Sequence, residues 1–236
     1  NVGVLAVKVT ATDGSSATGS DTFNITVANT NDAPTVANAI PNQTIAEDSA
    51  LNFQFNSNVF ADVDAGDSFT YIATLSDDSA LPSWLSFDAS TRTFSGTPLN
   101  ANVGAIDVKV TATDSGSAAI TDTFSITVTN TNDAPSITSS EVTSVNEDTA
   151  YSYTFEASDV DSGDTVTLAA TTIPSWLSFN SGTGVLSGTP RNSDVGDHSI
   201  VLTATDAAGV AVTQSFTITV TNTNDAPTVA NAIADQ

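Results

Sequence analysis

Carboxylate side chains recur at fixed places along this chain, and they are the residues best suited to chemistry. Asp62 and Asp64 are separated by one residue and precede a Gly-Asp pair, and the same arrangement returns at Asp159 and Asp161. An Asp closes each of three Thr-Ala-Thr-Asp strings, and an Asn-Asp pair lies in each of three Thr-Asn-Asp-Ala-Pro strings. Oxygen ligands of this kind suit Ca²⁺, which takes roughly six to eight of them in flexible geometry.

The composition favours a cationic partner over an anionic one. The chain has 236 residues, of which 27 are acidic and 4 basic, and its formal net charge is −23. Nucleic acid and anionic membrane surfaces require clustered Lys and Arg, so neither partner is expected. No stretch is long and apolar enough for membrane insertion. Zinc is disfavoured because there is one His and no Cys, and Mg²⁺ because it prefers octahedral geometry and bound water.

Turn formation is the alternative explanation for the acidic motifs. Asp and Asn favour turns, and one Asp-Val-Asp sequence followed by Gly-Asp would form a well-solvated turn. The recurrence of several motifs in the same order favours calcium. Paired carboxylates could also serve a glycosidase, but groups that recur in every repeat are typical of scaffold ligands. We therefore expect no enzyme activity.

Internal repeats define the domain organisation. The string Thr-Asn-Asp-Ala-Pro occurs three times, and Pro-Ser-Trp-Leu-Ser-Phe occurs twice at matching distances from it. Such fixed spacing is typical of tandem domains. It predicts two complete repeats, 35–135 and 136–227, with the C-terminal part of a preceding repeat at 1–34 and the first strand of a following repeat at 228–236.

Within each repeat, apolar and polar residues alternate. Val108, Val110 and Ala112, for example, alternate with Lys109 and Thr111. This period of two is typical of strands that bury one face. Because turn residues separate such segments at intervals of roughly 8–12 residues, we predict an all-β sandwich of about seven strands per repeat. Trp84 and Trp176 lie among Pro, Leu and Phe, so we expect them in the cores and not as sugar-stacking platforms.

The order of the motifs resembles that of a known family. Asn-Glu-Asp, Asp-Val-Asp-Ser-Gly-Asp, Ala-Thr-Asp and Asn-Asp-Ala-Pro follow one another as in the cadherin repeat. Together with Pro-Ser-Trp-Leu-Ser-Phe and Ser-Gly-Thr-Pro, they resemble more closely the dystroglycan-type cadherin-like ("putative Ig") repeats of large bacterial surface adhesins. The resemblance covers the whole chain. It implies Greek-key sandwiches of the Ig/cadherin type, arranged end to end, with Ca²⁺ between successive domains.

The resemblance also implies which residues hold calcium. The central junction would use Glu47, Asn132, Asp133, Asp159, Asp161 and Asp206, with Asp48 as a further candidate. The preceding junction would use Asn31, Asp32, Asp62, Asp64 and Asp114, and the following one Glu147, Asn224 and Asp225. Cadherins carry a Leu-Asp-Arg-Glu block after the Ser-Gly-Thr-Pro-like turn, whereas 99–104 and 191–196 read LNANVG and RNSDVG. We therefore expect one or two ions at each junction.

The implied function is that of a calcium-stiffened stalk or spacer segment of a secreted or cell-surface adhesin, acting in adhesion to cells or surfaces. Its partners would be the neighbouring repeats of the same chain. Two alternatives stay open, namely a calcium-dependent module that binds polysaccharide or another cell-surface ligand, and an accessory domain of an extracellular hydrolase. A glycan array with calcium present separates a spacer from a polysaccharide-binding module, because a spacer should show no ligand.

Overall fold

The computed structural model describes residues 2–64 and 66–229, and it is built almost entirely of strands. The chain divides into two compact units, residues 1–130 and 131–236. Within the described ranges, no helix is long and apolar enough to cross a membrane. The predicted all-β class is confirmed.

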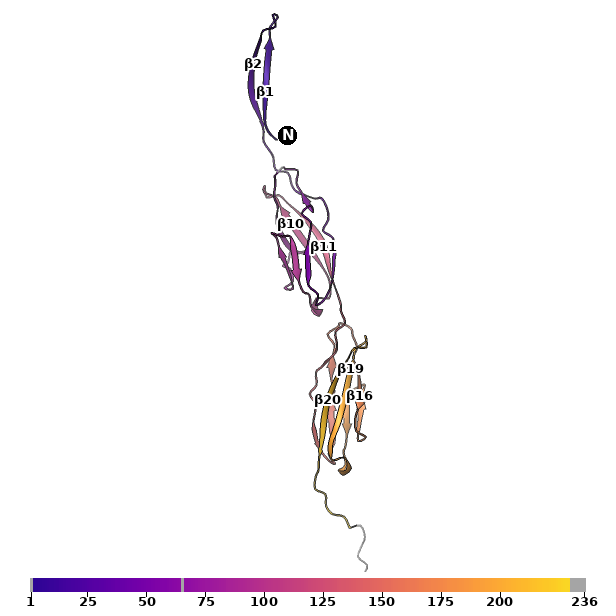
Figure 1. Ribbon diagram of the computed structural model, residues 1–236. Coiled ribbons are helices and arrows are strands. Elements are labelled where there is room, and N and C mark those ends of the chain that lie inside the picture. The colour runs from indigo at the N-terminus through magenta and orange to yellow at the C-terminus, as the bar shows by residue number, and fades with distance from the viewer. Residues whose placement is uncertain (1, 65, 230–236) are drawn as a thin grey trace, which may run out of the picture. The chain divides into compact units, whose positions relative to one another are not determined.

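Two long strands form a hairpin at the beginning of the first unit (Figure 1). β1 (Gly3–Thr12) pairs antiparallel with β2 (Thr18–Val27), and Ser16 takes a φ of 66° in the turn between them. The apolar residues that alternate along both strands remain exposed, with 59% of Leu5 and 48% of Phe23 accessible. The hairpin is therefore held by its backbone ladder, and its apolar face is open.

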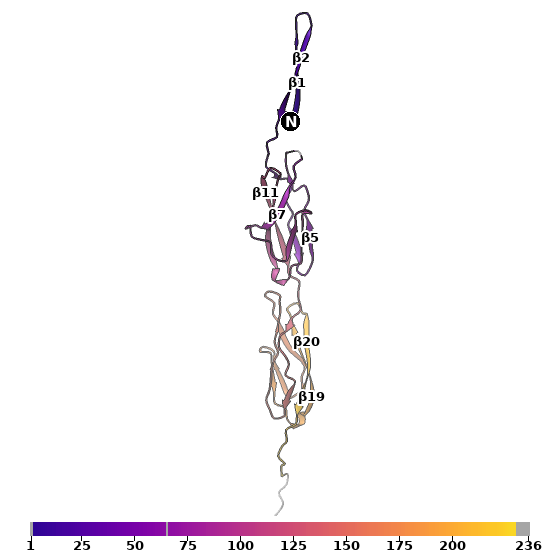
Figure 2. The same cartoon turned by 90° about the vertical axis from the view of Figure 1, so that its left-hand side faces the viewer.

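A β-sandwich follows the hairpin in the first unit. Its larger sheet has the strand order β4-β11-β10-β7, its smaller sheet has the order β5-β9-β8, and a short ladder pairs β3 with β6. In Figure 2, β5 lies on the opposite side of this unit from β7 and β11. The elements are β3 (Thr35–Val36), β4 (Gln43–Ala46), β5 (Leu51–Gln54), β6 (Phe60–Ala61), β7 (Thr70–Leu75), β8 (Leu85–Asp88), β9 (Thr93–Gly96), the 3₁₀ helix η1 (Asn100–Asn102), β10 (Gly104–Thr113) and β11 (Ala119–Thr129).

The second unit repeats this topology. Its sheets have the orders β13-β20-β19-β16 and β14-β18-β17, and its short ladder pairs β12 with β15. The elements are β12 (Ser136–Ile137), β13 (Ser144–Asn146), β14 (Tyr151–Thr154), β15 (Ala157–Ser158), β16 (Thr167–Thr172), β17 (Leu177–Asn180), β18 (Val185–Gly188), the 3₁₀ helix η2 (Asn192–Asp194), β19 (Gly196–Thr205) and β20 (Ala211–Thr221). Each sandwich thus has seven strands in its two main sheets, as predicted, and two further strands of two residues.

The strand that opens the larger sheet runs parallel to the strand that ends it. β4 pairs parallel with β11, and β13 pairs parallel with β20. The other strand pairs of the described residues are antiparallel. The polypeptide therefore enters each larger sheet beside the strand by which it leaves.

The alternating apolar residues form one core in each sandwich. Phe94 of β9 is fully buried, and its ring lies 5.4 Å from that of Phe124 of β11, so the two sheets of the first sandwich pack against each other. In the second sandwich, Leu186 takes the place of Phe94 and is fully buried, and Phe216 takes the place of Phe124 and packs against the core. Trp84 and Trp176 pack against the two cores, as predicted.

A glycine in each sandwich allows a close approach of two backbone segments. A Cβ atom on Gly96 would lie 1.8 Å from the carbonyl oxygen of Trp84, and a Cβ on Gly188 would lie 2.0 Å from that of Trp176. These distances are far below van der Waals contact, so a side chain cannot be accommodated. The glycine of the Ser-Gly-Thr-Pro string is therefore required by the packing of the Trp segment.

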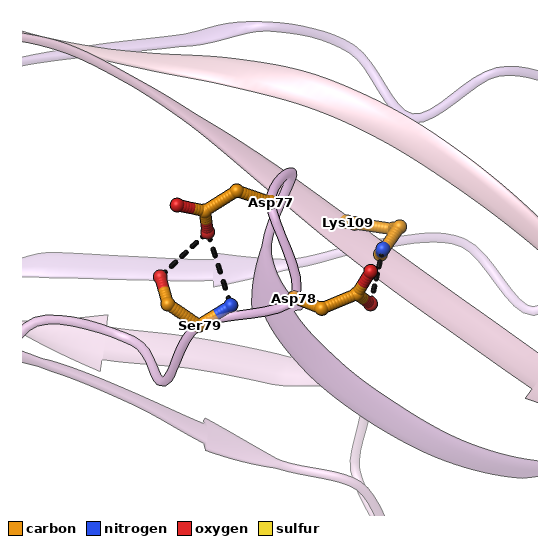
Figure 3. A network of polar contacts seen from close by, with 4 residues as sticks. All are labelled: Asp77, Asp78, Ser79 and Lys109. Atoms are coloured by element: carbon orange, nitrogen blue, oxygen red, sulfur yellow. Dashed lines mark hydrogen bonds and ion pairs between the residues drawn. The ribbon is translucent and has the colours of Figure 1, made fainter.

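The first sandwich contains a turn that is pinned to β10 by a salt bridge (Figure 3). The Asp77 carboxylate accepts hydrogen bonds from the backbone N–H and the hydroxyl of Ser79, at 3.0 and 2.6 Å, and these bonds hold the pKa of Asp77 below its ordinary value. Asp78 takes a φ of 72° and pairs with Lys109 of β10. The Lys109 position corresponds to Val201 in β19, so this contact belongs to the first sandwich.

The expectation that 228–236 form the first strand of a following repeat falls mostly outside the described residues. The structure describes that segment only through Val229, and residues 228 and 229 carry no strand.

Candidate metal centre

An acidic loop connects β15 to β16 in the second sandwich. It carries Asp159, Asp161 and Asp164, and Gly163 takes a φ of 89° within it. The backbone N–H of Asp161 donates to Asp159 Oδ1 at 2.9 Å, and that of Asp164 donates to the Asp161 carbonyl at 3.1 Å. These bonds fold the loop tightly, so its three carboxylates are brought together.

The segment that enters the second sandwich is tied to this loop and to the end of β19. The amide nitrogen of Asn132 donates to Asp206 Oδ2 at 2.8 Å and to the Asp133 carbonyl at 2.9 Å. The backbone N–H of Asp133 donates to Asp161 Oδ2 at 2.9 Å. Because the Asn132 amide nitrogen is engaged in these bonds, its carbonyl oxygen is the atom that can ligate a cation.

Asp206, the residue after β19, is buried and held as a carboxylate. Its Oδ1 accepts the backbone N–H of Val210 at 2.7 Å, while its Oδ2 accepts the Asn132 amide. The hydrogen bond from the Asn132 side chain is the main reason that the pKa of Asp206 is lowered, and backbone N–H groups add to the effect. Donors that favour the charged form keep this group ready to bind a cation at neutral pH.

The first sandwich contains the same arrangement. The backbone N–H of Asp64 donates to Asp62 Oδ1 at 2.8 Å, and the backbone N–H of Asp32 donates to Asp64 Oδ2 at 2.8 Å. The Asn31 amide nitrogen donates to Asp114 Oδ2 at 3.1 Å. Each of these three hydrogen bonds has a counterpart in the second sandwich, so the sequence repeat is also a repeat of this local arrangement.

In each sandwich three carboxylates converge closely enough to share one ion. One oxygen from each of Asp62, Asp67 and Asp114 lies within 4.8 Å of the others, and the same holds for Asp159, Asp161 and Asp164. Among the described residues, the buried oxygens Asp62 Oδ2, Asp67 Oδ2 and Asp159 Oδ2 have no hydrogen-bond partner. Buried carboxylate oxygens are costly without a donor or a cation. The donor set therefore fits a hard cation such as Ca²⁺.

Asp67 and Asp164 are members of these groups that the sequence-based ligand set does not contain. The hydroxyl of Ser115 donates to Asp67 Oδ1, and the backbone N–H of Ala207 donates to Asp164 Oδ1 at 3.2 Å. Both Asp residues follow a glycine with positive φ, Gly66 or Gly163. The Gly-Asp pair that recurs after Asp-Val-Asp is the sequence signal that could have identified them.

The remaining predicted ligands lie at the other end of each sandwich, where the chain leaves it. Glu47 is buried, and its backbone N–H donates to the carbonyl of Thr129, the last residue of β11. Its neighbour Asp48 is exposed, has a φ of 58°, and donates its N–H to the Pro98 carbonyl at 2.8 Å.

The second sandwich has a buried glutamate at the corresponding place. Glu147 is 2% exposed, and its Oε1 accepts the backbone N–H of Thr223 at 2.6 Å. Its Oε2 is buried and has no partner among the described residues. Asn224 and Asp225 follow Thr223 and are exposed. The Glu147 oxygen thus lies beside the exit of the chain and could accept a cation.

Solved structures with the same fold include cadherin repeats. The EC1–4 fragment of PcdhgB3 matches 94% of this chain and 58% of its own chain, with a TM-score of 0.63 and 18% identity. Extracellular cadherin domains 1–4 of protocadherin gamma B7 match 92% of this chain and 57% of their own, with a TM-score of 0.52 and 21% identity. At these identities the likeness concerns the fold alone.

Similarity in sequence extends to a bacterial adhesin. The serine-rich adhesin for platelets of Staphylococcus aureus strain MRSA252 is 36% identical over 161 residues, which is 66% of this chain but 11% of the relative. Its counterpart in strain MSSA476 matches equally, over 7% of its length. The chain thus spans about a tenth or less of the curated relatives it matches. The family model described as "Putative Ig domain" matches residues 33–129 and 134–221. The chain therefore belongs to this Ig-like family, and it contains two of its domains.

Proposed function

We propose that this chain is a calcium-stiffened spacer segment of a cell-surface adhesin. One observation carries the proposal. In both sandwiches, carboxylates with buried oxygens that lack hydrogen-bond donors converge where the Asn-Asp-Ala-Pro segment enters. The identity to a staphylococcal adhesin supports the surface role and an extracellular location.

The residues that would hold calcium are those that the hydrogen bonds already gather. In the second sandwich they are Asp159, Asp161, Asp164 and Asp206, together with Asn132 and Asp133 of the entering segment. In the first they are Asp62, Asp64, Asp67, Asp114, Asn31 and Asp32. A bound Ca²⁺ would supply the positive charge that offsets repulsion among these carboxylates.

The chain's own contribution is to place the entering segment against the acidic loop. The backbone N–H of Asp133 holds one oxygen of Asp161, and the Asn132 amide holds one oxygen of Asp206. These bonds orient the other oxygens and fix the direction in which the segment enters. A cation that neutralises the carboxylates of the acidic loop would therefore restrict the motion of the segment that enters the sandwich.

We further propose that the predicted ligands where the chain leaves each sandwich also bind calcium. Glu47, with Asp48 as a further candidate, belongs to the end of the first sandwich from which β11 leads into the Asn132–Asp133 segment. Glu147, Asn224 and Asp225 would serve in the same way where the chain leaves the second sandwich.

The test is thermal unfolding of the full 236-residue chain in calcium and in EDTA. Binding to the native state alone adds about 1.4 kcal/mol when Ca²⁺ is roughly tenfold above its Kd. Calcium should therefore raise the Tm, and Asp161→Asn should reduce this shift. Asp88→Asn is the matched control, because Asp88 is the exposed last residue of β8, where it accepts hydrogen bonds from Ser90. Equal melting curves in calcium and EDTA would refute calcium binding, whatever the glycan-binding behaviour of the chain.

A further inference from the structure

The parallel strand pair of each sandwich lies where a stretching force would act. The parallel pairing of β4 with β11 begins with Gln43 beside Ile126 and ends with Ala46 beside Thr129. Because the strands are parallel, the chain enters the pair at one end and leaves it at the opposite end. A force that separates the two ends of the sandwich slides these strands along each other, so the hydrogen bonds of the ladder are loaded together and are not opened one after another.

Side chains extend this connection in the first sandwich. The Asp122 carboxylate of β11 accepts the backbone N–H of Ile40 at 2.6 Å, and the backbone N–H of Ser125 donates to Asn42 Oδ1 at 2.9 Å. Ile40 is itself buried in the core. The segment between β3 and β4 is thus fastened to β11 before the ladder begins.

The second sandwich achieves the same connection with different residues. Gln214 of β20 pairs with Leu202 in the ladder, as Asp122 pairs with Val110. Its Nε2 donates to the Ser139 carbonyl at 3.2 Å, and its Oε1 accepts the hydroxyl of Tyr153 at 2.6 Å. In both sandwiches, the same register position of the last strand therefore anchors the segment that precedes β4 or β13.

We propose that each sandwich is a force-bearing module. Its mechanical clamp is the parallel strand pair, β4 with β11 or β13 with β20, together with one anchor residue, Asp122 on β11 or Gln214 on β20. This inference rests on strand topology and side-chain contacts within each sandwich. It does not depend on calcium and goes beyond the spacer role, because it assigns resistance to tension to named residues.

The experiment stretches the full chain from handles at its two ends, at constant force and in EDTA. The first sandwich is nine residues longer between its first and last strands, Thr35–Thr129 against Ser136–Thr221. Its unfolding step is therefore longer by about 30 Å at roughly 3.5 Å per residue. Asp122→Ala should shorten the lifetime of the first sandwich about fivefold, the effect of one hydrogen bond, and leave that of the second unchanged. Gln214→Ala should do the reverse.

The matched control is Gln54→Ala. Gln54 Nε2 donates to the Thr91 carbonyl at 2.6 Å, but β5 lies in the smaller sheet, away from the clamp. This variant also removes one bond from a side chain to the backbone, and the lifetime under force should not change. If Asp122→Ala does not fold, Asn42→Ala tests the same connection through Ser125. Equal shortening by Gln54→Ala and the clamp variants, or no shortening by either clamp variant, would overturn the proposal.

Discussion

The backbone N–H of Asp133 donates to the carboxylate of Asp161 at 2.9 Å, and the backbone N–H of Asp32 donates to that of Asp64 at 2.8 Å. Each bond joins the segment that enters a sandwich to the second Asp of its Asp-x-Asp sequence. A solvated turn would need no such partner. The recurrence of this bond indicates that the acidic loop and the entering segment form one structural unit.

Replacing Asn132 should loosen this unit. Asn132→Ala removes the hydrogen bond to Asp206 Oδ2, so the pKa of Asp206 should rise toward its ordinary value and the second sandwich should become less stable at neutral pH without calcium. NMR titration of Asp206 and urea unfolding in EDTA measure the two effects. Asn31→Ala is the matched variant in the first sandwich. An unchanged Asp206 titration in Asn132→Ala would contradict the assignment.

Acid should destabilise the second sandwich in a defined direction. The pKa of Asp206 is lower in the folded chain than its ordinary value of 3.8, so the folded state binds fewer protons than the unfolded state. The stabilisation by this group is complete above about pH 4 and disappears as the pH falls through the folded pKa. Thermal melts from pH 6 to about pH 2 in EDTA measure this loss. The dependence of stability on pH should be weaker in Asn132→Ala. An equally steep loss of stability in that variant would contradict the role given to Asp206.

Adding a methyl group at Gly96 should destabilise the first sandwich strongly. The new Cβ would overlap the Trp84 carbonyl oxygen at 1.8 Å, so two backbone segments would have to move apart. We expect a loss of about 3 kcal/mol, at the upper end of overpacking effects. Gly182→Ala is the control, because the nearest atom to its Cβ is an Asn180 side-chain oxygen at 3.5 Å. Urea unfolding compares them, and equal stability of the two variants would contradict the packing argument.

Truncating Phe94 should separate core stability from ion binding. Phe94 is fully buried and contacts Phe87 and Phe124, so Phe94→Ala should cost about 3–5 kcal/mol. Because Phe94 lies on β9 of the smaller sheet and the acidic loop connects β6 to β7, we expect the same loss in calcium and in EDTA. Urea unfolding in both buffers measures it. A loss that calcium abolishes would mean that the core and the metal site are coupled.

The all-β class was predictable because burial of one strand face imposes a period of two on the sequence. In β10, Val108, Val110 and Ala112 are fully buried, as their alternation with Lys109 and Thr111 predicted. The parallel pairing of β4 with β11 was not predictable in this way. Alternation identifies the buried face of a strand, but it does not identify the neighbouring strand or its direction.

The candidate site was predictable in part. Asn132, Asp133, Asp161 and Asp206 were identified from repeated motifs, and the structure connects them by hydrogen bonds. Asp67 and Asp164 were not among the predicted ligands, because their approach to within 4.8 Å of two other carboxylates depends on how the loop folds after a glycine with positive φ.

The strand-rich class, the recurrence of the acidic motifs and the apolar residues of each core follow from the order of the residues, because these features depend on local periodicity and on repetition. Three features follow instead from how the strands pack: which carboxylate oxygens converge, the burial of Glu147 beside the exit of its sandwich, and the hydrogen bonds by which Asp122 and Gln214 hold the first segment to the last strand. The contacts Ile40–Asp122, Ser139–Gln214 and Thr223–Glu147 join residues 75 to 82 positions apart in the chain. Contacts at such separations depend on how strands pair and pack, which local residue preferences do not specify.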